Sequence, residues 1–510
     1  MERSLKKRIL ISSILLSVII CIVVLTIICV NNRIFNEKGM NKIEIAANKY
    51  FNDNGYDNND YAEVSIQTLV DGNYISEDDV TAEQLKNGVV SISNTSADDN
   101  SKISVGYALN TNSYDNNITI GDYNATVTTY SSSSTSTFES YIDEETNEQI
   151  FKINSTEFAH SRFMLSVSGD TIKNNSHNIF VVRAQVRSEN ITYTQSYPKG
   201  ASLMVMYYDN GYSWSFSRED VKNSSEWKTI DIVVIPEYNV ETETNEDARI
   251  PLYLALGGTL SSEYVAGTAY FKNIEIINAE DETDVLNLND DEKLDITYSK
   301  NNRIKYVSYS TQRVQNDFTT TELQERVNVL EEVYESYAEL VGNSSSGKLL
   351  YPYKANTLVI LQTNKLQMGY GGLANYPIML TYNAAINIYN GTDRSFEFGI
   401  LHEMGHTFDH ILTSDDGTVN NGGGKWNFHS EMWANMKIFY ALYTKNITAI
   451  NGGKNLDYFD LLGLFKPSET TGFHHDNLNY FIYNSITDYE NKTVNFDVMK
   501  KIHQWFTLPV

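Results

Sequence analysis

The longest apolar stretch of the chain lies at its beginning. Residues 9–30 carry no charge, and four basic side chains precede them, Arg3, Lys6, Lys7 and Arg8. About 20 apolar residues span a bilayer, and flanking positive charge marks the cytoplasmic side. The pattern predicts a cytoplasmic tail at 1–8, an uncleaved single-pass anchor at 9–30 and an extracellular body, as on a bacterial cell surface. A cleaved signal peptide is the alternative, but its apolar region is usually only about 7–15 residues long.

After the anchor, the periodicity is first helical and then weak. Ile43, Ala46, Ala47 and Tyr50 recur at helical spacing, which predicts a short helix at 38–51 followed by a small irregular unit. We place this membrane-proximal region at 31–110. Its sequence indicates no function.

From about residue 111, short β-rich runs alternate with polar turns. Strands at this spacing are typical of an antiparallel sandwich. The predicted strands lie at 163–167, 179–186, 202–208, 229–235, 250–256 and 268–277. We therefore predict a β-sandwich of the jelly-roll type at 111–282, followed by a charged linker at 283–299.

Residues 300–510 combine a long helical period with short buried strands. Thr319 and Glu322 form a capping-box signature ahead of an amphipathic run that ends at Gly342. The next predicted elements are strands at 358–361 and 377–382, a glycine-bearing loop at 369–372 before the second strand, and an apolar helix at 396–412. This order predicts an α+β domain, so the whole chain is expected to be a multidomain protein.

Composition narrows the classes of function. A net charge of −26 argues against nucleic-acid binding, which needs a basic face. Both cysteines, Cys21 and Cys29, lie inside the predicted anchor, so the body has neither a disulfide nor thiolate chemistry. An aromatic content of 12% is more than disordered chains carry, and most of the body is expected to fold.

The candidate chemistry is concentrated in residues 402–406, which read HEMGH. Residues four apart lie on the same face of a helix, so His402 and His406 are predicted to hold one zinc ion per chain. Glu403 is then placed as the catalytic general base that acts on a water molecule at the zinc.

Such a site needs a third protein ligand and an open position for water. On a continuous helix His410 would lie about 12 Å from His402 along the axis, and no glycine stands between His406 and His410 to break the helix. Beyond a Gly/Asn-rich loop, Glu431 enters a second apolar helix and is the predicted third ligand. His429 is the main competitor.

Further polar residues have candidate supporting roles. Asp409 either orients the imidazole of His406 or caps a solvent face, and Asn435, one turn after Glu431, either contacts the far nitrogen of a ligating histidine or faces solvent. The strand at 377–382 is expected to be an edge that pairs with an extended substrate. Hydrolysis of a peptide bond at such a site would also need a donor to the oxyanion of the tetrahedral intermediate. The candidates for this donor are Tyr480, Tyr483, His474 and His475.

These residues carry a family resemblance. HEMGHTFDHILT, a loop and SEMWANMKIFYALY resemble the mucin-targeting, enhancin-like zinc metallopeptidases, which are gluzincins with a distal Glu that opens a helix. Met436 stands where that family commonly has a second Asn. The resemblance covers roughly residues 300–510 and implies a secreted or surface endopeptidase that acts on glycosylated, mucin-like proteins.

The sandwich carries a second, less specific resemblance. Residues 226–231, 251–258 and 267–274 are similar to the closing strands of carbohydrate-binding jelly-roll modules, which implies a glycan ligand. Sugar faces stack on exposed aromatic rings, and the alternative for each ring is a place in the core. The candidate rings are Tyr207, Tyr208, Tyr212 and Trp214.

The sequence thus predicts a membrane-anchored extracellular zinc endopeptidase that hydrolyses glycosylated, mucin-like proteins. Two alternatives stay open. One is a gluzincin peptidase on non-glycosylated surface proteins or peptides, like the lethal-factor-like exported peptidases. The other is a non-catalytic glycan-binding adhesin, against which the intact Glu403 argues, because a site without catalysis has no chemical need for the base.

Overall fold

The computed structural model describes most of the chain in segments. These are residues 42–43, 45–47, 49–50, 53, 62–80, 88–93, 102–107, 117–133, 135–193, 198–207, 213–239, 244–259, 261–342, 349, 351–352, 357–363, 365–366, 372–374, 376–408, 412–413, 419–420, 430–464, 486–488, 490–491 and 493–498. Those up to Tyr107 form one compact unit and those from Asn117 onward a second. Within these segments no helix has the length and apolar character needed to cross a membrane. The predicted anchor at 9–30 lies outside them.

The first unit is a small α/β structure with its own core. Its elements are β1 (Ala62–Ser65), α2 (Ile66–Asp71), η1 (Glu77–Asp79), β2 (Gly88–Ser93) and β3 (Lys102–Tyr107), with the strands in antiparallel order β1-β2-β3. Ile43, Ala46 and Ala47 are helical and buried against Ile66 and Leu69, as the helical spacing predicts. The sequence indicated an irregular unit instead of this sheet, because its short strands are separated by long polar stretches.

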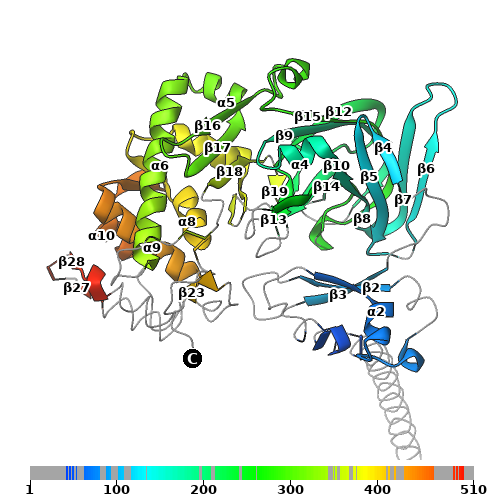
Figure 1. Cartoon of the computed structure of the whole chain (residues 1–510), viewed down its shortest axis with the longest axis horizontal. Helices are drawn as coiled ribbons and strands as arrows, with labels where there is room; N and C mark the ends of the chain where they lie inside the picture. The colour runs from blue at the N-terminus through cyan, green and yellow to red at the C-terminus, as the bar shows by residue number, and fades with distance from the viewer. Residues whose placement is uncertain are drawn as a thin grey trace, which may run out of the picture. The chain divides into compact units, whose positions relative to one another are not determined.

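The second unit begins with two antiparallel sheets packed face to face (Figure 1). In the first sheet the order β5-β8-β14-β10-β11-β19 is flanked by β4 on β5 and β13 on β14, and in the second it is β12-β9-β15-β7-β6. The strands are β4 (Asn117–Ile120), β5 (Tyr123–Ser131), β6 (Thr137–Ile142), β7 (Gln149–Ala159), β8 (Ser161–Ser168), β9 (Phe180–Thr192), β10 (Ala201–Tyr207), β11 (Ser213–Phe216), β12 (Ser224–Val234), β13 (Glu237–Asn239), β14 (Thr244–Leu256), β15 (Val265–Asn278) and β19 (Lys365–Leu366). The short helices are α4 (Asp170–Asn174) and η2 (Ser261–Glu263).

Alternating burial explains this sandwich. In β9, Val182, Ala184 and Val186 are fully buried while the residues between them are partly exposed, as a period of two requires. Phe163 of β8 meets Phe138 and Phe151 of the opposite sheet edge-on, with ring centroids 5.3 and 5.2 Å apart. The predicted sandwich is therefore present, and all six predicted strands lie on observed ones. The strands β4 to β7 were not predicted individually, because Thr, Ser and Glu interrupt their apolar pattern.

A third sheet carries the helices of the α+β region (Figure 1). Its order is β16-β17-β18-β21-β20, with β17, β18 and β21 parallel and the two edge strands antiparallel. These strands are β16 (Leu294–Tyr298), β17 (Ile304–Tyr309), β18 (Leu358–Gln362), β20 (Gly372–Leu373) and β21 (Ile378–Leu380). Because β21 lies between β18 and β20, the prediction that the strand at 377–382 is an edge is wrong. The edge strand at this end of the described sheet is β20.

The helix α6 (Thr320–Val341) begins with the predicted capping box. Thr319 Oγ1 accepts a hydrogen bond from the Glu322 amide at 3.1 Å, and the Glu322 carboxylate accepts one from the Thr319 amide at 2.7 Å. The other elements are η3 (Asp284–Asn287), α5 (Ser310–Gln315), α7 (Tyr382–Ala385), η5 (Ile386–Tyr389), β22 (Ser395–Glu397), α8 (Phe398–His406), β23 (Leu412–Thr413), β24 (Val419–Asn420), α9 (Ser430–Lys445), β25 (Thr448–Asn451), β26 (Lys454–Leu456), α10 (Tyr458–Leu464), β27 (Thr487–Asp488) and β28 (Thr493–Val494).

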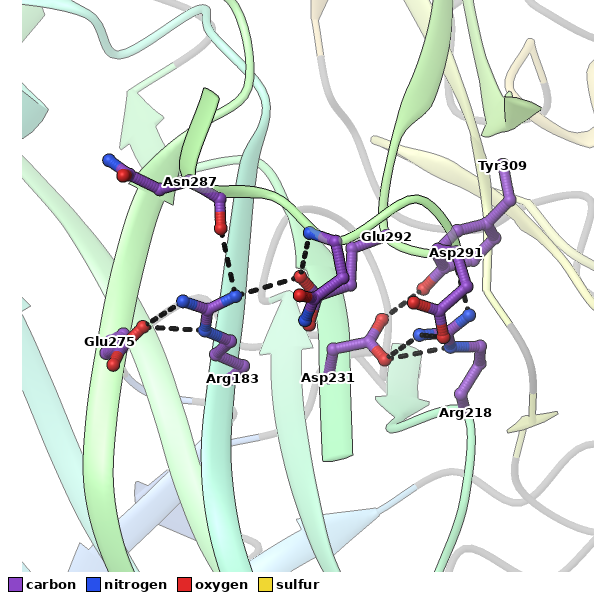
Figure 2. Close-up of polar contacts among 9 residues, drawn as sticks. Arg183, Arg218, Asp231, Glu275, Asn287, Asp291, Glu292 and Tyr309 are labelled. Atoms are coloured by element: carbon purple, nitrogen blue, oxygen red, sulfur yellow. Dashed lines mark hydrogen bonds and ion pairs between the residues drawn. The ribbon is translucent and has the colours of Figure 1, made fainter. Parts of the chain in front are cut away.

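The predicted linker at 283–299 is an ordered connection rather than a free spacer. It holds η3 and β16, and Arg183 of β9 fastens it to the sandwich by donating to the Asn287 carbonyl at 3.1 Å and to Glu292 at 2.9 Å (Figure 2). Arg183 also donates to Glu275 on the neighbouring β15 at 2.6 Å. The charges that made this stretch resemble a linker are therefore used in ion pairs.

A buried polar contact joins the sandwich to the third sheet. Asp231 of β12 accepts hydrogen bonds from Arg218 and, at 2.8 Å, from the hydroxyl of Tyr309 on β17 (Figure 2). The Arg218 guanidinium also lies over the Tyr309 ring, 4.9 Å from its centroid. Burial raises the pKa of Asp231, although both donors favour its ionised form.

Candidate active site

The helix α8 separates its apolar residues from its chemical ones. Leu401, Met404 and Gly405 are buried, whereas His402, Glu403 and His406 are partly exposed. Because neighbouring helical positions are about 100° apart, this pattern buries one face of α8 and leaves the HExxH side chains on the other.

The two histidines converge on a common point. Their Nε2 atoms lie 3.0 Å apart, and the rings are nearly perpendicular at 88° with centroids 4.5 Å apart. Asn435 of α9 places its Oδ1 3.0 Å from Nδ1 of His402. An amide oxygen only accepts hydrogen bonds, so Nδ1 of His402 is the donor in this contact, and the tautomer with its proton at Nδ1 leaves Nε2 for metal ligation.

This arrangement fits a zinc site. Two imidazole nitrogens on one tetrahedral zinc ion, each at about 2.0–2.1 Å, lie roughly 3.3 Å apart, a few tenths of an ångström more than the distance observed here. The hydrogen bond at Nδ1 fixes the tautomer that metal ligation requires. The predicted contact between Asn435 and His402 is present. Asn435 is only 2% exposed, so the alternative prediction that its amide faces solvent is wrong.

The candidates for a third ligand lie outside the side chains that the structure describes. Glu431 occupies the first turn of α9, one turn before Asn435 and on the same helix face. Its side chain, His429, His410 and Asp409 are not among the described ones. Within the described ranges, no group of three His, Cys, Asp or Glu side chains is placed to hold a metal ion.

The argument that set His410 aside is wrong. It assumed a helix continuous through 396–412, but α8 ends at His406, with Thr407 as its C-cap and the Thr407 hydroxyl donating to the Met404 carbonyl at 2.7 Å. His410 therefore stays open as an alternative to Glu431.

Glu403 lies against the edge strand β20. A Cβ atom placed on Gly372 would come within 2.9 Å of Glu403 Cγ and 3.2 Å of its Oε1. Real Cβ atoms are not found that close, so only glycine at 372 lets the strand approach Glu403 this closely without a shift. The glycine-bearing loop at 369–372 was singled out in the sequence, but this contact with Glu403 was not predicted.

Gly405, the last variable position of HEMGH, brings α8 close to α9. A Cβ atom on Gly405 would lie 2.9 Å from the Ala434 carbonyl oxygen and 3.2 Å from the Ala434 Cβ. This close approach places the next residue, Asn435, within hydrogen-bond distance of His402. The signal was available in the sequence, since a glycine inside a helical pattern usually has a packing reason.

Two buried side chains of α6 hold α8 and the turn before it. Tyr337 donates its hydroxyl to the Leu401 carbonyl at 3.1 Å. Arg326 donates to the carbonyls of Ile388 at 2.9 Å, Asn390 at 2.8 Å and Thr392, in the turn that leads into β22 and α8. Burial lowers the pKa of Arg326 to about 10, and the guanidinium also packs on the Phe396 ring.

The remaining predicted residues fall into two groups. The candidate oxyanion donors His474, His475, Tyr480 and Tyr483, the rings of Tyr208 and Tyr212 and the side chain of Trp214 lie outside the described parts. Tyr207 is a correction, because it is 3% exposed, belongs to the sandwich core and accepts a hydrogen bond from the Ile235 amide at 3.2 Å. A ring without an exposed face cannot stack on a sugar. Tyr207 is therefore a core aromatic, which was the alternative predicted for each of these rings.

No protein-family model matches the chain, and no curated protein matches it. Two solved structures are similar. The Family 11 carbohydrate-binding module of the cellulosomal cellulase Lic26A-Cel5E of Clostridium thermocellum has 14% identity and a TM-score of 0.20, and covers 30% of this chain and 87% of its own. The Family 11 module from Clostridium thermocellum in complex with a β-1,3-1,4-mixed-linked tetrasaccharide has 12% identity, a TM-score of 0.20, and covers 32% and 94%.

Proposed function

We propose that the chain is a membrane-anchored extracellular zinc endopeptidase of the enhancin-like, gluzincin type that cleaves glycosylated, mucin-like proteins. The observation that carries the proposal is the geometry of α8. The Nε2 atoms of His402 and His406 lie 3.0 Å apart, and Asn435 contacts the other ring nitrogen of His402. Both histidines share a partly exposed helix face with Glu403.

Each residue has a defined task in this proposal. His402 and His406 would hold the zinc ion, with Glu431 as the third ligand. Bound zinc would supply Lewis acidity, which polarises a peptide carbonyl and acidifies water. Glu403 would accept a proton from the attacking water and return it to the leaving amine. Asn435 would keep Nε2 of His402 unprotonated.

The substrate side of the proposal rests on the edge strand. β20 pairs with β21 on one side only in the described sheet, and Gly372 brings it against Glu403. An extended peptide added to this edge would pass close to the general base. A glycan ligand of the sandwich, with Tyr208, Tyr212 and Trp214 as candidate stacking rings, would direct the enzyme to glycoprotein.

Glu403→Gln in the full-length protein tests the catalytic assignment. We expect zinc content and thermal unfolding to match the wild type, while cleavage of an O-glycosylated mucin-type substrate falls by about 10²–10⁴-fold, as for loss of a general base. Glu325→Gln, on the exposed face of α6, is the matched control and should cleave normally. Cleavage by Glu403→Gln at the wild-type rate would disprove the assignment.

Removing the O-glycans from the same substrate tests the glycoprotein part. We expect the deglycosylated protein to be cleaved more slowly than the glycosylated one. Equal rates would favour the peptidase of non-glycosylated proteins. A wild-type protein that neither binds zinc nor cleaves either substrate would favour the adhesin.

A further inference from the structure

Thr363, at the end of β18, connects the sandwich to the candidate active site. Its amide donates to the Leu380 carbonyl of β21 at 2.7 Å, and its Oγ1 lies 2.5 Å from Oγ of Ser215 on the sandwich strand β11. Thr363 is 3% exposed and Ser215 is fully buried. A buried hydroxyl pair of this kind is costly to break, because each group loses a partner that water does not replace.

A main-chain contact reinforces the same junction. The strand β19 follows Thr363 and pairs antiparallel with β11, with Leu366 opposite Ser215 and Lys365 opposite Phe216. The segment that leaves β18 therefore adds one short strand to the sandwich sheet. Side-chain and main-chain hydrogen bonds thus hold the chain on β11 a few residues before β20 begins.

Packed contacts continue from this junction to Glu403. Leu380, which accepts the Thr363 hydrogen bond, lies opposite Gly372 in the β20–β21 pair. The Cβ position of Gly372 lies 3.2 Å from Leu380 Cδ2 and 2.9 Å from Glu403 Cγ. Because interiors are close-packed, a shift of β21 must be taken up by β20 and by the Glu403 side chain.

We propose that β11 of the sandwich positions the substrate-binding edge of the peptidase, and that Ser215 and Thr363 are the positioning residues. The inference rests on the proposed function, in which an extended peptide pairs with β20. It goes further in giving the sandwich a role inside the catalytic region besides any binding of glycan. Loss of the contact should weaken binding of long peptide substrates more than the chemical step.

The test uses Thr363→Val, which removes the hydroxyl at nearly constant shape, and Thr363→Ser, which keeps the hydroxyl. Ser161→Ala is the matched control, since Ser161 is fully buried and its hydroxyl lies 2.8 Å from those of Ser131 and Ser136 inside the sandwich. Amide hydrogen exchange of residues 372–380 is measured in all full-length variants. The kcat and KM values are measured with a long O-glycopeptide and with a short peptide.

Thr363→Val should speed amide exchange at 372–380 and raise KM for the long substrate by about five- to tenfold, as expected for one lost buried hydrogen bond. The kcat for the short peptide should change less than twofold. Thr363→Ser should restore both values, and Ser161→Ala should change neither. Exchange at 372–380 that is the same in Thr363→Val and Ser161→Ala would overturn the inference. If the wild type cleaves nothing, the proposed function fails, whereas the exchange result still decides the positioning.

Discussion

The two glycines of α8 lie in different surroundings, and this difference predicts opposite effects of the same substitution. A Cβ atom on Gly405 would meet Ala434 of α9, whereas nothing lies within 4 Å of one on Gly399. Gly405→Ala should lower the free energy of unfolding by about 1–3 kcal/mol through overpacking. Gly399→Ala should raise it by a few tenths to about 1 kcal/mol, because alanine favours the helix. Denaturant unfolding of both variants checks this, and equal effects would contradict the close approach of α8 and α9.

His160 gives the sandwich a pH dependence. It is 2% exposed, with Nδ1 2.9 Å from the Gly257 carbonyl and Nε2 2.9 Å from an Arg162 nitrogen. Burial, followed by the charge of Arg162, lowers the pKa of His160 from 6.5 to about 3. The unfolded chain therefore binds a proton near pH 6.5 that the folded chain refuses until about pH 3, so stability is lost as the pH falls through this window.

His160→Gln should remove this contribution, because an amide can make the same two contacts without titrating. Wild-type stability should fall below pH 6.5 by up to about 1.4 kcal/mol per pH unit more than that of the variant. Denaturant unfolding at several pH values between 7 and 4 measures the difference. Parallel curves for the two proteins would show that His160 does not titrate in this way.

Residue-level contacts were predictable from the sequence only where a motif or a helical period indicated them. The i+4 spacing from Glu431 to Asn435 indicated a hydrogen bond to a histidine, and the HExxH spacing placed His402 and His406 together. The contact of Glu403 with Gly372 was not predictable in this way. Gly372 lies 31 positions earlier in the chain (403 − 372), and no periodicity indicates that its strand ends beside α8.

Among the elements, α6 carries a buried charge, Arg326, that holds the turn before β22 and α8. Arg326→Met should lower the free energy of unfolding by roughly 2–4 kcal/mol, because three carbonyls of the turn before β22, among them that of the buried Ile388, lose their donor. Arg326→Lys should recover only part of this, since an ammonium group lacks the planar fork. Lys293→Met, in an exposed pair with Asp290, should cost less than about 1 kcal/mol. Similar losses in Arg326→Met and Lys293→Met would contradict a stabilising role for the hydrogen bonds that Arg326 donates to these carbonyls.

Element types were predictable, but their ends and their neighbours were less so. The capping box placed the start of α6 correctly because it is a local motif. The helix at 396–412 was predicted too long, since α8 ends at His406 although apolar residues recur as far as Leu412. The edge of the third sheet was misplaced because β20 has only two residues, too few to show a period.

At the scale of the whole molecule, the predicted division of the body into sandwich, linker and peptidase domain does not describe how the chain packs. The buried apolar side chains of the sandwich and of the α+β region form one continuous core. Polar contacts at Asp231, Thr363 and Lys305 reinforce it, the last through a 2.7 Å hydrogen bond to the His177 carbonyl. Sequence periodicity identifies the faces of each element, but it contains no information on which buried polar groups pair across a distance.

A single core predicts that the second unit unfolds as one cooperative body. Asp231→Ala tests this, because Asp231 lies in the sandwich while Tyr309 lies in the third sheet. Burial raises the pKa of Asp231, which shows that the carboxylate is costly to bury in its ionised form. Replacing it by alanine removes the acceptor of the hydrogen bonds from Arg218 and from the Tyr309 hydroxyl. A loss of about 1–3 kcal/mol is expected for the lost hydrogen bonds, because Arg218 is partly exposed and keeps its ion pair with Asp291 at 3.0 Å.

The loss should be shared by both regions. Amide exchange in β9 and β15 of the sandwich and in β17 and β18 of the third sheet should report the same opening free energy in the wild type, and the same decrease in Asp231→Ala. Tyr309→Phe should act non-additively with Asp231→Ala, by about 0.5–3 kcal/mol, since both remove one shared contact. Two separate transitions, or a decrease confined to the sandwich strands, would mean that the sandwich is an independent module, and Ser215 would then have no rigid body through which to position β20.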